Sequence, residues 1–182
     1  MTDTPQVVVA AGPDEKIPAL VCEHTIKKYC PDAAVIQVHD REDRPSRGLV
    51  QHGGKDPTNF SFVRFWVPEL LGFQGRAIYL DSDMIVFADI SELFNLDMGD
   101  RWVLTANKGC HSVLLINCAL VPWDVHEMMR RANNAPGFYG HNMRTIGETP
   151  PELIGYAPEV WNHRDRYVEG ETKLLHYTNM AT

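Results

Sequence analysis

The chain has 182 residues, of which 44% are hydrophobic and 23% charged, as in ordinary soluble globular proteins. This length suits a single domain over residues 1–182 with a real buried core. The formal net charge of -7 provides no general field to attract nucleic acid and excludes a non-specific DNA or RNA binder. An anionic nucleotide substrate would therefore need a local cation or a few placed basic side chains.

The sequence contains no signal for a membrane or for export. No apolar run approaches the roughly 18 residues of a membrane-spanning helix, and Met1–Pro5 lacks the basic and apolar regions of a signal peptide. The cysteines show no CxxC spacing and mostly lie in apolar surroundings: Cys22, Cys30, Cys110 and Cys118. Buried free thiols in a reducing compartment are favoured over disulfides or zinc, which predicts a cytoplasmic protein.

The first forty residues predict a strand, a helix and a second strand. The runs from Gln6 to Ala11 and from Ala34 to Val38 are typical of strands buried on both faces. Between them, Lys16–Tyr29 is predicted to be a helix, ended by Pro31, with a stripe of side chains facing inward: Ala19, Cys22, Ile26 and Tyr29. This β-α-β beginning indicates a parallel sheet in an α/β fold.

The middle of the chain predicts a loop, a helix and a strand. Residues 41–57 are charged and rich in glycine and proline, which is typical of an exposed loop. Residues 59–71 are predicted to be helical, disturbed by Pro68, with a buried side formed by Phe62, Phe65 and Trp66. A strand then leads into Asp81, and the apolar run Met84–Phe87 follows.

The C-terminal half continues the alternation of strands and helices. Strands are predicted at Trp102–Ala106 and Val113–Ile116, and a helix opened by its proline at Pro122–Asn133. We expect Gly137–Pro151 to be irregular and Lys173–Tyr177 to form a short final strand. The whole pattern predicts an α/β protein.

The two carboxylates of Asp81-Ser82-Asp83 are the most informative feature of the chain. Residues two apart on an extended chain point to the same side, so the motif is expected to aim two oxygen ligands at one point. Mg²⁺ and Mn²⁺ prefer such ligands and complete their shell with substrate phosphates. The alternative, two aspartates that cap a turn, is disfavoured because their apolar flanks would impose a desolvation cost. Ligands of open α/β sheets also bind beyond the carboxyl ends of the strands.

Two enzyme classes have a hydrophobic strand that ends in Asp-x-Asp. In haloacid-dehalogenase-like phosphatases, which would use Asp81 as a nucleophile, the motif usually lies on the first strand and a later acidic cluster completes the Mg²⁺ site. Here the motif lies well into the chain, and no such cluster follows. The phosphatase is therefore the weaker alternative to the second class, the nucleotide-sugar glycosyltransferases.

Tyr79–Val86, with Asp89–Phe94 behind it, resembles the central motif of glycosyltransferase family 8, which includes glycogenin-like and lipopolysaccharide galactosyl- and glucosyltransferases. Four further segments resemble family segments in the same order: Val9–Ala11, Phe62–Leu71, Ser112–Asn117 and Leu175–Thr178. The resemblance spans nearly the whole chain, although only the central motif is highly specific by itself.

The resemblance implies the GT-A fold, a Rossmann-like α/β/α sandwich around a mostly parallel mixed sheet. It also implies a metal-dependent enzyme that transfers a hexose, with retention, from a nucleoside-diphosphate sugar such as UDP-glucose or UDP-galactose. The acceptor, whether glycan, lipid-linked or protein, stays unidentified. A non-catalytic nucleotide-sugar-binding protein is the other alternative, because the segments expected to face the sugar match poorly.

The resemblance assigns metal ligands and donor-binding residues. Asp81, Asp83 and His176 would bind Mn²⁺ or Mg²⁺, and the imidazole favours Mn²⁺ because nitrogen ligands suit transition metals. Residues assigned to the donor UDP-sugar are Ala10, Ala11, Asp14, Arg64 and Ser82. Arg64 would brace the donor or orient Asp81 through a bidentate contact, or else be a surface charge. Asp14 would hydrogen-bond the base or ribose, or else simply form a turn.

The chain departs from the family pattern where the sugar and acceptor should bind. Cys110-His111-Ser112 replaces the family's Asn-Ala/Ser-Gly, and Gly140–Met143 lies where an Asp-Gln-x-x-Asn stretch is expected. His111 and Asn142 are the only, weak, candidates for catalysis, and a front-face mechanism in which the departing phosphate deprotonates the acceptor is the default. Asn179 replaces a glycine and the sequence stops at Thr182, which predicts a compact or C-terminally truncated domain.

Overall fold

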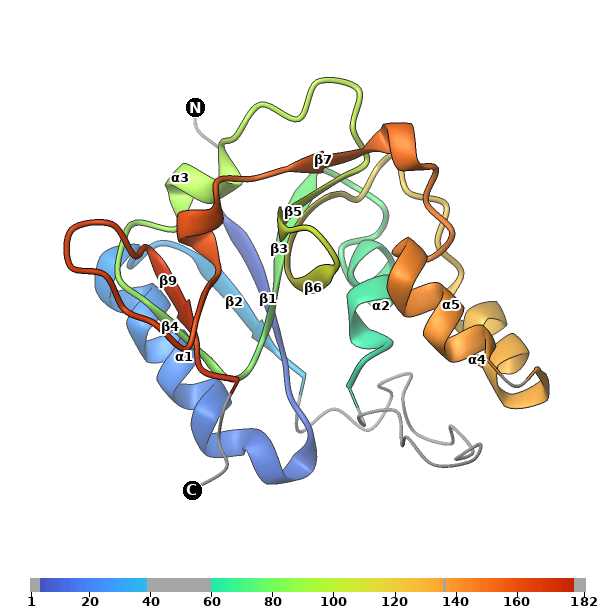
Figure 1. Cartoon of the computed structure of the whole chain (residues 1–182), viewed down its shortest axis with the longest axis horizontal. Coiled ribbons are helices and arrows are strands. Elements are labelled where there is room, and N and C mark those ends of the chain that lie inside the picture. Colours follow the sequence, from blue (N-terminus) through green and yellow to red (C-terminus); the bar gives the residue numbers. More distant parts are fainter. Residues whose placement is uncertain (1–3, 39–59, 136, 179–182) are drawn as a thin grey trace.

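The computed structural model describes residues 4–38, 60–135 and 137–178. Its centre is a six-stranded sheet in the order β2-β1-β3-β6-β5-β7 (Figure 1). The strands span Gln6–Ala10 (β1), Ala34–Gln37 (β2), Arg76–Asp81 (β3), Val103–Asn107 (β5), Cys110–Asn117 (β6) and Ile154–Tyr156 (β7). Strand β1 is parallel to β2 and β3, and β5 is parallel to β7, whereas β6 is antiparallel to β3 and β5. The predicted mixed sheet is confirmed.

A second, three-stranded sheet brings the end of the chain back to its middle. It consists of β4 (Met84–Val86), β9 (Leu174–His176) and β8 (His163–Arg164) in the order β4-β9-β8. Strand β9 is antiparallel to β4 and parallel to β8. The C-terminal strand predicted around Leu174 therefore lies beside the residues that directly follow Asp83.

Helices cover both faces of the central sheet, as the α/β/α prediction requires (Figure 1). Helix α1 (Lys16–Tyr29) lies on one face, next to β4. The opposite face carries α2 (Val63–Leu70), α4 (Val125–Asn134) and α5 (Phe138–Thr145). Shorter elements are α3 (Ser91–Phe94) and the 3-10 turns η1 (Pro13–Glu15), η2 (Pro151–Leu153) and η3 (Glu159–Trp161).

The two buried cores follow from the alternation of side chains along the central strands. Val7 and Val9 of β1 pack in the core on the α1 side, whereas Val8 packs in the core on the α2 side. Strand β3 alternates in the same way, with Leu80 on the α1 side and Tyr79 on the α2 side. A continuous apolar run is thus explained by burial on both faces.

Two predictions about buried residues are wrong. Tyr29 was expected in the inward stripe of α1, but it is 37% exposed at the end of the helix, while Ala19, Cys22 and Ile26 are buried. Strand β2 was expected to be fully buried, yet each of its residues is only partly buried because β2 is the edge of the sheet. The predicted free thiols are confirmed, since all four cysteines are unpaired and only Cys110 is partly exposed.

Two predictions about helices are also wrong. The prediction that Gly137–Pro151 is irregular is wrong, because this segment contains α5, which begins after Gly137 (φ 87°) and ends at Thr145, before Ile146 (φ 49°). Helix α4 begins at Val125, later than expected, because the Asp124 carboxylate rather than Pro122 caps its first turn by accepting from Glu127 N–H. The predicted loop at 41–57 lies outside the described residues. None of the described helices is long and apolar enough to cross a membrane.

Candidate active site

Asp81 and Asp83 lie at the carboxyl end of β3, in the middle of the sheet. Strand β3 ends at Asp81, and the chain bends at Ser82 and Asp83 before β4 starts in the second sheet. The prediction that both carboxylates project from one extended strand is therefore wrong. Along β3, the side chains of Tyr79 and Asp81 lie two residues apart, point to the same side and are hydrogen-bonded to each other. The bend turns Asp83 toward the second sheet instead.

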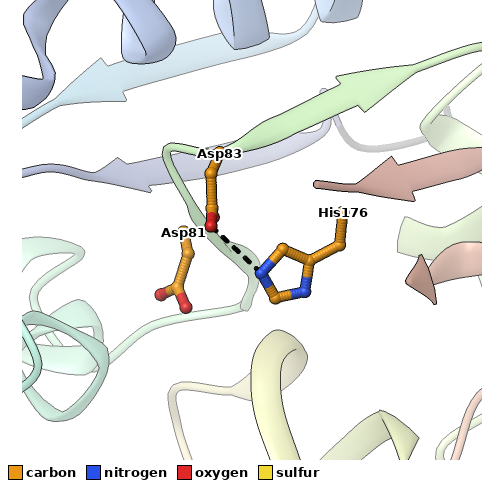
Figure 2. A group of neighbouring side chains, drawn as sticks. All are labelled: Asp81, Asp83 and His176. Atoms are coloured by element: carbon orange, nitrogen blue, oxygen red, sulfur yellow. Dashed lines mark ion pairs between the residues drawn. The ribbon is translucent and has the colours of Figure 1, made fainter. Parts of the chain in front are cut away.

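His176 completes a cluster with the two aspartates, hereafter the carboxylate–histidine cluster (Figure 2). Strand β9 places it opposite Met84, the residue after Asp83, and its Nε2 lies 3.3 Å from Asp83 Oδ2. The ligand atoms of the three residues all lie within 4.8 Å of one another. Burial opposes protonation of His176, but the hydrogen bonds with Asp83 and Cys110 outweigh it and raise its pKa to about 9.

Asn162 holds the other side of the His176 ring. Its Oδ1 lies 3.1 Å from His176 Nδ1, and its amide nitrogen donates to the Cys110 sulfur at 3.6 Å. Burial raises the pKa of the Cys110 thiol, but hydrogen bonds with His176, Ser112 and Asn162 lower it to about 6. A carbonyl acceptor on the second nitrogen is the usual support of a metal-binding histidine. Asn162 is not among the site residues predicted from the sequence, because nothing in its own neighbourhood shows that it meets His176.

Tyr79 and Arg64 hold Asp81 from the α2 side of the sheet. The Tyr79 hydroxyl donates to Asp81 Oδ1 at 2.5 Å, and the Arg64 guanidinium reaches the same oxygen at 3.5 Å. Arg64 also donates to the carbonyls of Ser61 and His111. Burial lowers the pKa of Arg64, but Tyr79 and Asp81 outweigh it and raise that pKa. Arg64 is buried, so the alternative of a surface charge is wrong, and its contact with Asp81 uses one oxygen and is not bidentate.

The end of β1 and the turn after it lie next to this site. Ala10 pairs with Asp81, and Ala10 and Ala11 are both fully buried, so the exposed surface on this side begins at the turn after them. Asp14 is exposed in η1. Glu15, which sequence reasoning missed, accepts from Gly12 N–H at 2.7 Å and from the Ser82 hydroxyl. Burial, with Asp83 and Asp81 nearby, raises the pKa of Glu15.

His111 and Asn142, hereafter the polar junction, lie where α2, α5 and the start of β6 meet. Tyr139 of α5 donates to Ser61 at 2.8 Å, and Asn142 is one helical turn further along the same face. Asn142 is fully buried, yet its amide oxygen and nitrogen have no hydrogen-bond partner among the described residues. Both ring nitrogens of His111 are also buried without a well-formed hydrogen bond, although the Arg144 backbone lies near enough to oppose the fall in the pKa of the ring. Burial, then Arg64, lowers the pKa of His111 to about 4, so the ring is neutral at physiological pH.

The carboxylate–histidine cluster has the ligands expected of a divalent-metal site. Two carboxylates and one imidazole form a mixed oxygen and nitrogen set that suits Mn²⁺, and three protein ligands leave positions for oxygens of a substrate. Tyr79 hydrogen-bonds to Oδ1 of Asp81, and Asn162 lies within hydrogen-bond distance of Nδ1 of His176. In metal sites, such hydrogen-bond partners orient the ligands. The residues present therefore fit such an ion.

Solved structures of similar shape are GT-A glycosyltransferases, and this chain has the same fold. Galactosyltransferase LgtC, solved in complex with donor and acceptor sugar analogues, superimposes with a TM-score of 0.67 at 15% identity over 97% of this chain and 88% of that one. The glycosyltransferase GlyE of Streptococcus pneumoniae gives 0.69 at 18% identity, covering 98% of this chain and 55% of GlyE. The predicted GT-A architecture is confirmed.

Sequence comparison identifies the family. Residues 21–139, more than half of the chain, match glycosyltransferase family 8, so the chain belongs to that family and is a glycosyltransferase. A relative over most of its length is protein CDI of Arabidopsis thaliana, 28% identical over 204 residues that cover 95% of this chain and 77% of CDI. GlyE is 36% identical over 67 residues, which cover 32% of this chain and 16% of GlyE.

Proposed function

We propose that this glycosyltransferase uses Mn²⁺ to bind a UDP-hexose, UDP-glucose or UDP-galactose, and transfers the hexose with retention to a hydroxyl of its acceptor. The observation that carries the proposal is the carboxylate–histidine cluster at the carboxyl end of β3, the edge at which α/β sheets bind ligands. A bound divalent ion would supply charge neutralisation and Lewis-acid assistance to the departing diphosphate. Asp81, Asp83 and His176 are its proposed ligands.

Different residues around the cluster are assigned to different parts of the donor. Ala10 and Ala11 are fully buried at the end of β1, so the uracil ring and the ribose hydroxyls are assigned to the turn that follows them, with the exposed Asp14 and the partly buried Glu15. Ser82 is buried in the bend next to Glu15, so its assigned role is to hold the bend between Asp81 and Asp83 rather than to contact the diphosphate. Arg64 keeps Asp81 in place rather than contacting the sugar, because its donors are already occupied.

The polar junction supplies the groups for the sugar itself. Buried polar atoms without partners cost about 1–3 kcal/mol each, so two such side chains indicate a ligand that completes their hydrogen bonds, and Arg64 links the backbone of His111 to Asp81 of the cluster. A neutral His111 offers one donor and one acceptor, and the Asn142 amide offers both, which matches the hydroxyl groups of a hexose. Both are positioned to orient the sugar, and neither is a nucleophile.

Transfer then follows a front-face path. The acceptor oxygen bonds to the anomeric carbon on the face from which the diphosphate departs, which retains the configuration. The bond between the anomeric carbon and the diphosphate oxygen breaks, its electron pair stays on the diphosphate, and the acceptor proton passes to a diphosphate oxygen. No side chain has to form a covalent intermediate.

A thermal-shift panel of nucleoside-diphosphate sugars tests the proposal. UDP, UDP-glucose or UDP-galactose at about 100 times its Kd should raise the melting temperature by roughly 5–10 °C with Mn²⁺ and by much less with EDTA. Asp81→Asn should lose the response, whereas Asp100→Asn, a change at an exposed carboxylate with no contact among the described residues, should keep it. A UDP response equally strong in EDTA would rule out the proposed metal ligands, and a stronger response to another base would rule out UDP.

A further inference from the structure

A hollow approaches the carboxylate–histidine cluster through Asn162, and none of the three cluster residues lines it. It has a volume of about 480 Å³ and is lined in part by Asn162, the residue that holds His176. Another lining residue, Asn107, pairs with Cys110 across the β5–β6 hairpin. In the sheet, β3 lies between β1 and this hairpin, so the hollow and the turn after β1 approach the cluster from opposite sides. A donor bound along β1 leaves this hollow open for the second substrate.

The hollow presents two arginines that no other described residue engages. Arg164 and Arg166 both line it, both are exposed, and neither has an ion pair or hydrogen bond within the described part of the chain. Two carboxylates, Glu159 and Glu171, lie on the same wall, and Glu159 also accepts from the Asn107 amide at 3.2 Å. Asn107 Oδ1 is buried without a partner there. The wall therefore offers free cationic donors next to a few amide and carboxylate groups.

We propose that this hollow is the acceptor subsite and that the acceptor is a sugar with an anionic group, a carboxylate or a phosphate. The proposal rests on the proposed function, because an acceptor subsite has a role only in an enzyme that also binds a donor sugar. A guanidinium forms paired hydrogen bonds with either anion, and the amides beside it suit sugar hydroxyls. The two arginines also offset electrostatic repulsion, because an anionic acceptor must approach the negative charges of Asp81, Asp83 and the donor diphosphate.

The test is titration calorimetry with three sugars that differ only at carbon 6: glucose, glucuronic acid and glucose 6-phosphate. EDTA is present throughout, so that no anion can bind through a metal. At least one anionic sugar should bind about tenfold or more tightly than glucose, because charge-assisted hydrogen bonds are stronger than neutral ones. The double variant Arg164→Gln/Arg166→Gln should bind all three alike. Arg130→Gln, which removes an exposed arginine of α4 paired with Glu127, should keep the preference.

Each outcome decides one point. Binding of only the uronic acid or only the phosphate identifies which anion the acceptor carries. Equal binding of glucose and both anions, or a preference that persists in the double variant, overturns the proposal. The thermal response to UDP and Mn²⁺, measured on EDTA-free portions of the same protein preparations, reports separately on the donor half and on folding. A lost UDP response with intact anion binding would contradict the proposed function but leave the hollow as an anionic-sugar site.

Discussion

The carboxylate–histidine cluster and the polar junction lie on either side of Arg64 and differ in how their polar atoms are satisfied. In the cluster, both ring nitrogens of His176 and the Asp81 carboxylate have partners. In the junction, none of the side-chain polar atoms of His111 and Asn142 has a well-formed hydrogen bond among the described residues. One guanidinium touches both regions, through Asp81 Oδ1 and the His111 carbonyl.

The side chains of the cluster are thus fixed by hydrogen bonds in the free protein, whereas the junction has polar side-chain atoms left to pair with a ligand. The proposed metal ion would need ligands fixed in direction, and the contacts of Asn162 and Tyr79 with the cluster meet that need. A sugar brings its own donors and acceptors, so leaving the junction unsatisfied lowers the stability of the free protein and raises its affinity for a hydroxyl-rich ligand. Variants of each region should therefore fail in different ways.

The largest effect is expected at the cluster. Asp83→Asn removes a charged ligand and the partner of His176, so transfer should fall by about 10³-fold, equivalent to about 4 kcal/mol of lost transition-state stabilisation. The measurement is UDP release from the preferred UDP-hexose with saturating Mn²⁺. Full activity in Asp83→Asn would contradict the assignment of this carboxylate.

A smaller loss of activity with a gain in stability is expected at the junction. Asn142→Leu removes hydrogen bonds to the sugar and should lower kcat by about 10²-fold with little change in UDP affinity. The melting temperature should rise by roughly 2–4 °C, because about 1 kcal/mol is gained when an unsatisfied buried amide becomes an apolar group of similar size. Asn134→Leu, at an exposed position of α4, should do neither. A stability loss in Asn142→Leu would show that its amide is satisfied in the free protein.

The support of His176 should matter for the metal and not for the sugar. Asn162→Ala should weaken Mn²⁺ binding by about 10–100-fold, the usual cost of losing the second partner of a metal-binding histidine. Asn162→Asp keeps an oxygen at that position and should restore most of the affinity. Calorimetry or electron paramagnetic resonance of Mn²⁺ measures both. Equal affinities of Asn162→Ala and the unchanged protein would mean that His176 needs no such support.

The smallest effect is the acid sensitivity that His111 confers. Its pKa is about 4 in the folded protein and about 6.5 when unfolded, so its contribution to stability is complete above pH 6.5 and is lost as the pH falls toward 4. His111→Asn should reduce the drop in melting temperature between pH 7 and pH 4.5 by roughly 2–4 °C, or about 1 kcal/mol. His24→Asn, at an exposed position of α1, should keep the whole drop. An unchanged drop in His111→Asn would mean that the ring becomes protonated without cost.

Much of this protein could be predicted from its sequence, because the necessary information is local. The boundaries of α1, the strand that ends at Asp81 and the helix with buried Phe62 and Phe65 all follow from hydrophobic periodicity and proline positions. Helix α5 was missed because its short sequence begins and ends at glycine-rich breaks and carries many polar residues. The edge position of β2 was missed because pairing order is absent from a strand's own sequence.

By itself, the sequence determined the α/β class, the family resemblance and the three residues of the cluster, since each is carried by residue types at readable spacing. Only the tertiary structure decided which atoms meet. It paired Asp81 with Tyr79, buried Arg64, placed Asn162 against His176 and Glu15 against Gly12, and left the side-chain polar atoms of His111 and Asn142 without well-formed hydrogen bonds. The reason is physical. A side chain's partner depends on which strands lie side by side and where a bend turns the chain, and those contacts join residues up to a hundred positions apart.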